Sequence, residues 1–333
     1  MARLRFIAGR LAALAVLLLV LSLVLFVLQE VSDADPVAST LGANASQEAR
    51  EAARERMGLN DPAPERYLDY VGGLVTGDLG TSFRTRHPVA DDIGTYLPAT
   101  LELVLGALLV ALVLAVAFAV SSVLRWRGAG LVRGLLFLGS TTPTFLLGIL
   151  GLMLFYRDLG WLPASGRLSD RGAVDGPTGL VVLDALLAGQ PAVAVDALQH
   201  LLLPALALAV GPALSIGRVL RSGLVTTLDA DFVRTARAKG LTERRVLARH
   251  VMRNSVNGAL SMTGLQLGFM FAGALVIESV FSWPGLGSYL GASIPVSDFP
   301  AIAGVTFVLG AIYIASNTVA DVLQGAADPR IAL

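Results

Sequence analysis

The sequence contains no cysteine, one lysine and three histidines. Without cysteine, the chain cannot form disulfides, zinc–cysteine sites or thiol nucleophiles. His87, His200 and His250 lie far apart in the sequence, so a metal cluster is not expected. The single lysine, Lys239, precedes a glycine, whereas the phosphate-binding loop of ATPases places its lysine after the glycines. The chain therefore cannot hold ATP by that device.

Charged residues are also scarce. They make up 15% of the 333 residues, against about 25% in an ordinary soluble domain. Hydrophobic residues make up 55%, and the mean hydropathy is +0.70. This composition predicts an integral membrane protein, and the net charge of zero favours no nucleic-acid partner. Because neither a Gly-x-Ser-x-Gly nor a His-Glu-x-x-His motif occurs, we predict no catalytic residue, metal site or cofactor in this chain.

Six apolar segments have the length of a membrane span, which is about 20 residues. The first follows three arginines and exceeds the apolar core of a signal peptide, which has about 7–15 residues. Residues 29–31 also form a poor cleavage region, so we interpret it as a span. The predicted spans are Leu11–Leu28, Leu103–Leu124, Gly134–Tyr156, 198–220, Ser255–Ile277 and Phe299–Ala320.

The distribution of basic residues predicts the orientation. With the N-terminus inside the cell, the segments 1–10, 125–133, 218–254 and the C-terminal tail hold 16 of the 25 lysines and arginines. Short cytoplasmic segments carry such an excess, so both termini are predicted to be cytoplasmic. The long polar segment 30–98 is then external. It is either a loop that packs on its own membrane domain or a contact surface for a solute receptor.

The third predicted span contains Thr141-Thr142-Pro143-Thr144. A proline within a span predicts a kink, with threonine hydroxyls bonding the freed carbonyl groups. This kink either lines a path through the membrane or serves helix packing.

The longest polar interruption in the second half of the chain runs from Asp231 to Asn257. It predicts two short helices joined at Gly240, where a positive φ suits the end of a helix. Asp231 suits the start of the first helix by capping and by the helix dipole. Thr242 can cap the second helix, with Glu243 in its first turn.

The second of these helices is predicted to be amphipathic. Arg245, Arg249 and Arg253 recur every four residues on one face, and Leu247 and Val251 lie roughly opposite. The segment is either a charged loop that only sets topology or a docking surface for another protein.

The string RTARAKGLTERRVLARHVMRN resembles the cytoplasmic EAA loop of ABC-importer permeases, in their dipeptide/oligopeptide branch. The Ala–Gly signature of that loop falls at Ala236 and Gly240. Arg234 and Thr235 stand where other branches have Glu-Ala. The strings GDLGTSFRTRHPVADDI, LPATLEL, WLPASG, VIESVFSWPGLG and ADPR are similar to the same branch, so the resemblance covers almost the whole chain.

The resemblance implies an all-α integral membrane protein, a six-transmembrane-helix ABC permease bundle with a long external loop after its first helix. The implied parts are a first helix over 1–29, the loop over 30–98, a type I permease core over 99–325 and a tail over 326–333. The core includes an EAA-like coupling loop at about 225–258.

The same resemblance implies the partners and the setting. They are a second homologous permease subunit, two ATP-binding subunits that hold ATP and magnesium, and an external solute-binding protein, in the bacterial plasma (inner) membrane. The implied substrates are di- and oligopeptides, with nickel or another small solute as the alternative. The residues expected to couple to the ATPase are Asp231, Arg234, Ala236, Arg237, Gly240, Glu243, Arg244 and Arg245. Thr142, Pro143 and Glu278 are the expected pathway or gate residues.

A stand-alone secondary transporter or channel is the alternative from a different class. It would need ionisable groups within the membrane, for which Glu102, Glu278 and Asp321 are the candidates. All three lie near predicted span ends, where they could equally be solvated or paired with a neighbour. A membrane scaffold or an enzyme is a further alternative, and an enzyme would need a catalytic cluster that the sequence does not suggest.

Overall fold

The computed structural model describes residues 2–31, 37, 41, 46–56, 58–124, 128–170, 172, 174 and 176–327. These residues are mainly helical, and the extended backbone among them pairs only in an isolated bridge between Thr81 and Pro88. The α-helices are α1 (Ala2–Val31), α3 (Gln47–Arg56), α4 (Ala63–Thr76), α5 (Val89–Leu124), α6 (Ala129–Thr141), α7 (Thr144–Gly151), α8 (Val181–Leu187), α9 (Pro191–Leu228), α10 (Asp231–Ala238), α11 (Glu243–Val246), α12 (Met252–Val280), α13 (Leu286–Ser293) and α14 (Phe299–Ala327). Two π-helical segments, η1 (Leu152–Asp158) and η2 (Leu247–Val251), and one 3₁₀ turn, η3 (Ile294–Val296), complete the list.

Five stretches of helix in the described residues are long and apolar enough to cross a membrane, and a bent pair of helices makes up to six. The predicted helical membrane protein is therefore confirmed. The helices are longer than the apolar segments that predicted them. For example, α5 begins at Val89, well before Leu103, and α9 continues through Pro204 and Pro212.

The third span differs most from its prediction, because the expected kink is a break. The axes of the helices on either side of the break, Arg133–Thr141 and Thr144–Asp158, differ by 116°. Thr142 is extended, at φ −91° and ψ 134°, because a residue before proline avoids the helical region. The expected hydroxyl bonds are present, since Thr141 Oγ1 and Thr142 Oγ1 donate to Leu138 O at 2.9 and 3.0 Å.

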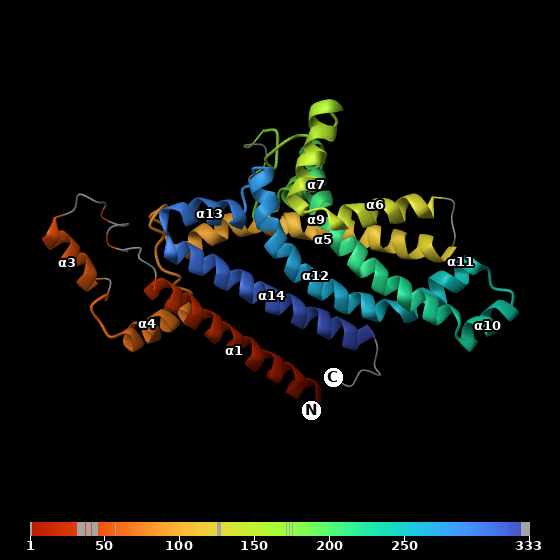
Figure 1. Ribbon diagram of the computed structural model, residues 1–333, viewed down its shortest axis with the longest axis horizontal. Coiled ribbons are helices and arrows are strands. Elements are labelled where there is room, and N and C mark those ends of the chain that lie inside the picture. The colour runs from red at the N-terminus through yellow and green to blue at the C-terminus, as the bar shows by residue number, and fades with distance from the viewer. Residues whose placement is uncertain are drawn as a thin grey trace. The chain divides into compact units, whose positions relative to one another are not determined.

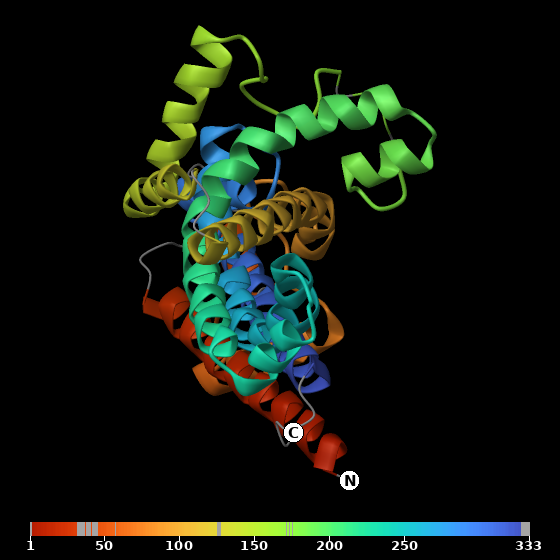
Figure 2. The same ribbon diagram turned by 90° about the vertical axis from the view of Figure 1, so that its right-hand side faces the viewer.

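The chain divides into two compact units. The first comprises 1–98 with 284–314, and the second comprises 99–283 with 315–333. In the second unit α9 packs against α6, α7, α8 and α12. Figure 2 shows α8 folded back beside the first part of α9, and Figure 1 shows α10 and α11 beyond the cytoplasmic ends predicted for α9 and α12. The second unit thus holds both the predicted coupling loop and the broken span.

In the first unit, α4 packs on α1. Arg66 Nη2 lies 2.7 Å from Glu30 Oε1, and Ser22 Oγ lies 3.1 Å from the hydroxyl oxygen of Tyr67. This part of the long polar segment therefore packs on its own membrane helix. At the start of α3, Ser46 Oγ accepts a hydrogen bond from Ala49 N at 3.2 Å.

The stretch GDLGTSFRTRHPVADDI is ordered around two buried carboxylates of the first unit. Asp298 accepts hydrogen bonds from the Ser82 hydroxyl and from the backbone N–H groups of Phe83 and Arg84. Asp92 accepts a bond from the Tyr289 hydroxyl at 2.9 Å, and burial raises the pKa of Tyr289. These bonds give the string a structural role close to α13 and the start of α14.

Candidate coupling helices and membrane cleft

The helix α10 begins one residue earlier than a cap at Asp231 would require. Ala230, at ψ 146°, is the N-cap, and Asp231 is the first helical residue, with no side-chain capping bond. The capping role predicted for Asp231 is therefore wrong, although its charge does lie in the first turn, where the dipole favours it. Its carboxylate lies 3.6 Å from Arg234 Nη1, and both side chains are exposed.

The turn between α10 and α11 depends on Gly240, which has φ +77°. The Gly240 N–H donates to Arg237 O at 2.9 Å, and the Leu241 N–H donates to Ala236 O at 3.3 Å. These two bonds form the Schellman motif that ends a helix at a left-handed residue. A Cβ on Gly240 would meet no atom within 4 Å, so the requirement for glycine comes from φ alone. Thr242 is the N-cap residue of α11 but makes no side-chain capping bond.

Arg237 and Glu243 join the two helices across this turn. Arg237 Nε lies 2.7 Å from Glu243 Oε1, and Arg237 Nη2 lies 3.1 Å from Glu243 Oε2. This bidentate hydrogen bonding raises the pKa of Arg237. Arg244 and Arg245 are exposed at the start of the second helix. We refer to α10, α11 and η2 together as the coupling helices.

The inner face of the coupling helices is buried in a hydrophobic cluster. Its members come from five α-helices of the second unit and from η2, and Ala236 is among them, with 7% of its surface exposed. The small Ala236 therefore faces the protein's own core and lets α10 approach it closely. The cluster comprises Ala115, Ala119, Ile216, Leu220, Leu224, Val233, Ala236, Val246, Leu247, Val251 and Ala259. Leu247 and Val251 are buried as predicted, and Arg245, Arg249 and Arg253 are exposed.

Close backbone contacts hold the helices that support this cluster. A Cβ on Gly217 would lie 3.2 Å from Ala115 O, and a Cβ on Gly223 would lie 2.9 Å from Ser255 O. Ser255 Oγ also donates to Val251 O at 2.8 Å. These contacts pack α9 closely against α5 and α12, the membrane helices that carry the cluster.

Phe232 is a candidate docking residue that the sequence analysis missed. It lies on the outer side of α10, and 45% of its surface is exposed. The signal was available, since Phe232 is a large apolar side chain within a polar segment, next to Val233, which is buried. Together, Phe232 and the exposed arginines form an apolar and basic surface that suits a protein partner.

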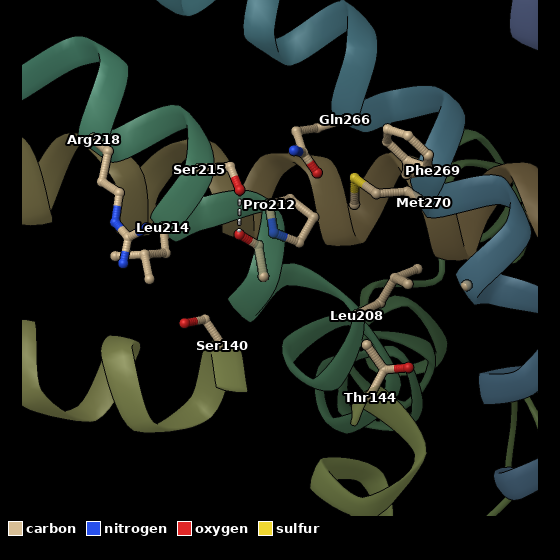
Figure 3. Close-up of a pocket in the computed structure, with 12 residues that line it drawn as sticks. Ser140, Thr144, Leu208, Pro212, Leu214, Ser215, Arg218, Gln266, Phe269 and Met270 are labelled. Carbon is tan, nitrogen blue, oxygen red and sulfur yellow. Dashed lines mark hydrogen bonds between the residues drawn. The ribbon is translucent and has the colours of Figure 1, made fainter. Parts of the chain in front are cut away.

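A cleft of about 370 Å³ lies beside the break in the third span (Figure 3). Ser140 and Thr144, on either side of the break, line it, whereas Thr142 and Pro143 do not. Thr142 and Pro143, two of the three expected pathway residues, therefore lie at the break and outside the lining of the cleft. Its lining comprises Ser140, Thr144, Leu208, Gly211, Pro212, Leu214, Ser215, Arg218, Gln266, Phe269, Met270 and Gly273.

Glu278 lies elsewhere in the second unit and is fully buried. Thr100 Oγ1 donates to Glu278 Oε1 at 2.6 Å, and Trp283 Nε1 donates to Ala99 O at 2.8 Å. These bonds tie the end of α12 to α5. With no exposed surface, Glu278 cannot touch a solute in this conformation, although it can hold the two helices together.

Glu102 is also buried and is paired with Arg167. It accepts a further bond from Val182 N at 2.8 Å. Two of the three acids that a stand-alone transporter could use thus have partners within the fold. The side chain of Asp321, the third, lies outside the described residues.

Comparison with known proteins agrees with the geometry. Residues 100–333 match the sequence model of the family described as binding-protein-dependent transport system inner membrane component, and residues 3–104 match its N-terminal companion. The chain is 39% identical to the Di/tripeptide transport system permease protein DppB of Pseudomonas aeruginosa (strain UCBPP-PA14), over 98% of each chain.

The similarity to two further relatives also extends over most of the chain. The chain is 39% identical to the Probable D,D-dipeptide transport system permease protein DdpB of Escherichia coli K12, over 92% of this chain and 91% of the relative. It is 35% identical to the Dipeptide transport system permease protein DppB of Alkalihalophilus pseudofirmus, over 97% of each. With a broken span beside a cleft, and coupling helices seated on the ends of its membrane helices, this chain belongs to the family of inner membrane components of binding-protein-dependent transport systems.

Proposed function

We propose that this chain is the transmembrane permease subunit of an ATP-driven ABC importer that takes up di- and oligopeptides. The observation that carries the proposal is the seating of α10 and α11 on the cluster shared with α5, α9 and α12. The relatives support the substrate class, because the three compared above are named for transport of dipeptides or of di- and tripeptides.

ATP hydrolysis takes place on partners in this proposal. Two ATP-binding subunits hold ATP and magnesium, a second homologous permease completes the pathway, and an external solute-binding protein delivers the peptide. The chain lies in the bacterial plasma (inner) membrane with both termini in the cytoplasm. It is built from the first helix (1–29), the external segment (30–98), the permease core (99–325) and a short tail (326–333).

In this proposal the coupling helices receive the movement of the ATP-binding subunits. Phe232 is the apolar anchor that enters a cleft on an ATP-binding subunit, and Arg234, Arg244 and Arg245 pair with acidic groups around it. Gly240 and the pair of Arg237 with Glu243 fix the turn, while Ala236 and Asp231 set the packing and the charge at the start of α10. Closure of the ATP-binding pair then displaces the coupling helices and, through the shared cluster, the ends of the membrane helices.

The movement of the membrane helices then opens the cleft alternately to the two sides of the membrane. The break at Thr142 and Pro143 is a hinge beside the cleft, and Glu278 holds the outer end of α12 on α5 as part of the gate. Such a cycle works only if ATP, the binding protein and the peptide each favour one of the two conformations.

The experiment is gentle purification of a tagged copy from its native membrane, followed by identification of the accompanying chains and a dipeptide uptake assay in liposomes. We expect a second permease and ATP-binding chains to accompany it, and uptake to require ATP. Recovery of this chain alone, with transport that needs no ATP, would overturn the proposal and favour a stand-alone transporter.

A further inference from the structure

Arg218 is the single charged residue in the lining of the cleft, and the described residues of that lining include no acid. Figure 3 shows its side chain extending from α9 toward α6, on which Ser140 lies. The guanidinium carbon lies 5.9 Å from the centre of the Phe137 ring. The ion pairs of the described residues include neither Arg218 nor Arg221. The charge of Arg218 is therefore available to an anion that enters the cleft.

Arg218 stands where the cleft meets a second hollow of about 570 Å³. The two share Leu214 and Arg218, and the second is more basic, since Arg133 and Arg221 also line it. In the proposed orientation this hollow is at the cytoplasmic end of the fourth span. Among the described residues, Arg218 is thus the charged one that lines both.

The other polar groups of the cleft are neutral. The hydroxyl of Ser140 donates to Phe137 O at 2.9 Å, and that of Ser215 donates to Gly211 O at 3.2 Å. Gln266 adds an amide from the middle of α12. A guanidinium that forms no ion pair in such a cleft attracts anions, and its planar fork matches a carboxylate.

We propose that Arg218 binds the terminal carboxylate of a peptide during its passage through this cleft. Every unmodified peptide carries that group, so one arginine can serve peptides of different sequence. The inference rests on the proposed peptide transport and assigns a residue to it. It also argues against nickel as the substrate, because the cleft repels a cation and its described lining has no imidazole, thiolate or carboxylate ligand.

Arg221 provides a matched control. It is one turn further along α9, is exposed like Arg218, and lines only the second hollow of the two. If the arginines served only to set topology or to bind anionic lipid headgroups, losing either one would have similar effects. A role for Arg218 in the pathway predicts an effect at Arg218 alone.

The test is ATP-driven uptake of a labelled dipeptide by the complete importer in liposomes, with the binding protein in excess. We expect Arg218→Gln to lower the maximal uptake rate about tenfold or more, because that is the effect of losing one charged hydrogen bond. Arg218→Lys should keep part of the wild-type rate, and Arg221→Gln should match the wild type. Wild-type uptake by Arg218→Gln, or an equal loss in Arg221→Gln, would overturn the assignment.

The absence of cysteine from this chain allows a second measurement on the assembled importer. Arg218→Cys can be modified with a cationic or with an anionic methanethiosulfonate of similar size, with the wild-type importer treated in parallel. We expect the cationic reagent to restore uptake and the anionic one not to. Equal effects of the two reagents would contradict a role for the charge. A wild-type importer that takes up no dipeptide would refute the proposed function instead, so the two failures are distinguishable.

Discussion

Arg237 and Glu243 face each other across the turn at Gly240 and share two hydrogen bonds, of 2.7 and 3.1 Å. The first residue lies on α10 and the second begins α11, so the pair sets the angle between the coupling helices. Both side chains are exposed, and solvent weakens such a pair as a source of stability. We infer that the pair serves to fix the angle between the two helices, because a docking surface must keep its shape while it transmits force.

A charge exchange tests this geometric role. Arg237→Glu alone and Glu243→Arg alone should each lower ATP-driven dipeptide uptake several-fold, because like charges then face each other across the turn. The double variant Arg237→Glu/Glu243→Arg restores an attractive pair and should recover most of the uptake, measured at matched membrane levels. If Arg237 instead bound an acidic group of the ATPase, the exchange would not rescue uptake.

Gly240 can be tested through its backbone. A non-glycine residue in the left-handed region costs about 1–2 kcal/mol, more if it is β-branched, whereas asparagine tolerates that region. Gly240→Val should therefore insert into the membrane normally but lose coupled uptake, and Gly240→Asn should keep it. The measurement is dipeptide uptake together with the ATPase rate of the complex. Normal uptake by Gly240→Val would remove the coupling role of this turn.

Phe232 is expected to anchor the ATP-binding subunit. Phe232→Ala removes an exposed side chain, so the permease should remain folded while its affinity for that subunit falls about thirtyfold, as for an interface hot spot of about 2 kcal/mol. Val225 of α9 has the same exposed fraction, 45%, and Val225→Ala is the control. Titration of detergent-solubilised permease with the ATP-binding subunit measures both. Unchanged affinity in Phe232→Ala would place the docking surface elsewhere.

The features that could be predicted from the sequence are those that depend on residues adjacent in the chain. The turn at Gly240 and the N-cap position of Thr242 rest on local backbone preferences, and the apolar lengths predicted the spans. The cap predicted at Asp231 was wrong by one residue, because Ala230 already has the extended conformation that precedes a helix.

Contacts between distant segments could not be predicted in this way. Ala236 was expected at the docking surface because of a signature, and only the packing of five α-helices and η2 shows that it faces inward. The cleft combines residues of α6, α7, α9 and α12, so no single stretch of sequence contains it. A proline predicts that a helix bends but does not say by how much, because neighbouring helices decide that.

Glu278 and Thr100 are 178 residues apart in the sequence, and their hydrogen bond is buried. Thr100→Val keeps the shape of the side chain but removes the donor, so a buried carboxylate oxygen loses a partner. We expect this change to lower the stability of the permease by about 1–3 kcal/mol, measured as a lower Tm in detergent. Thr95→Val, at an exposed threonine of the same helix, should change the Tm little.

Glu278→Gln separates a holding role from ion coupling. The amide retains an oxygen that can accept the hydrogen bond of Thr100, so a residue that only holds α12 on α5 should tolerate the change, and ATP-driven uptake should persist. An ion-coupled carboxylate would not tolerate it, because an amide cannot release a proton or carry the negative charge that binds a cation. Uptake is therefore measured with ATP present and the proton and sodium gradients collapsed. Loss of uptake in Glu278→Gln, with its Tm unchanged, would assign this carboxylate to transport and not to packing.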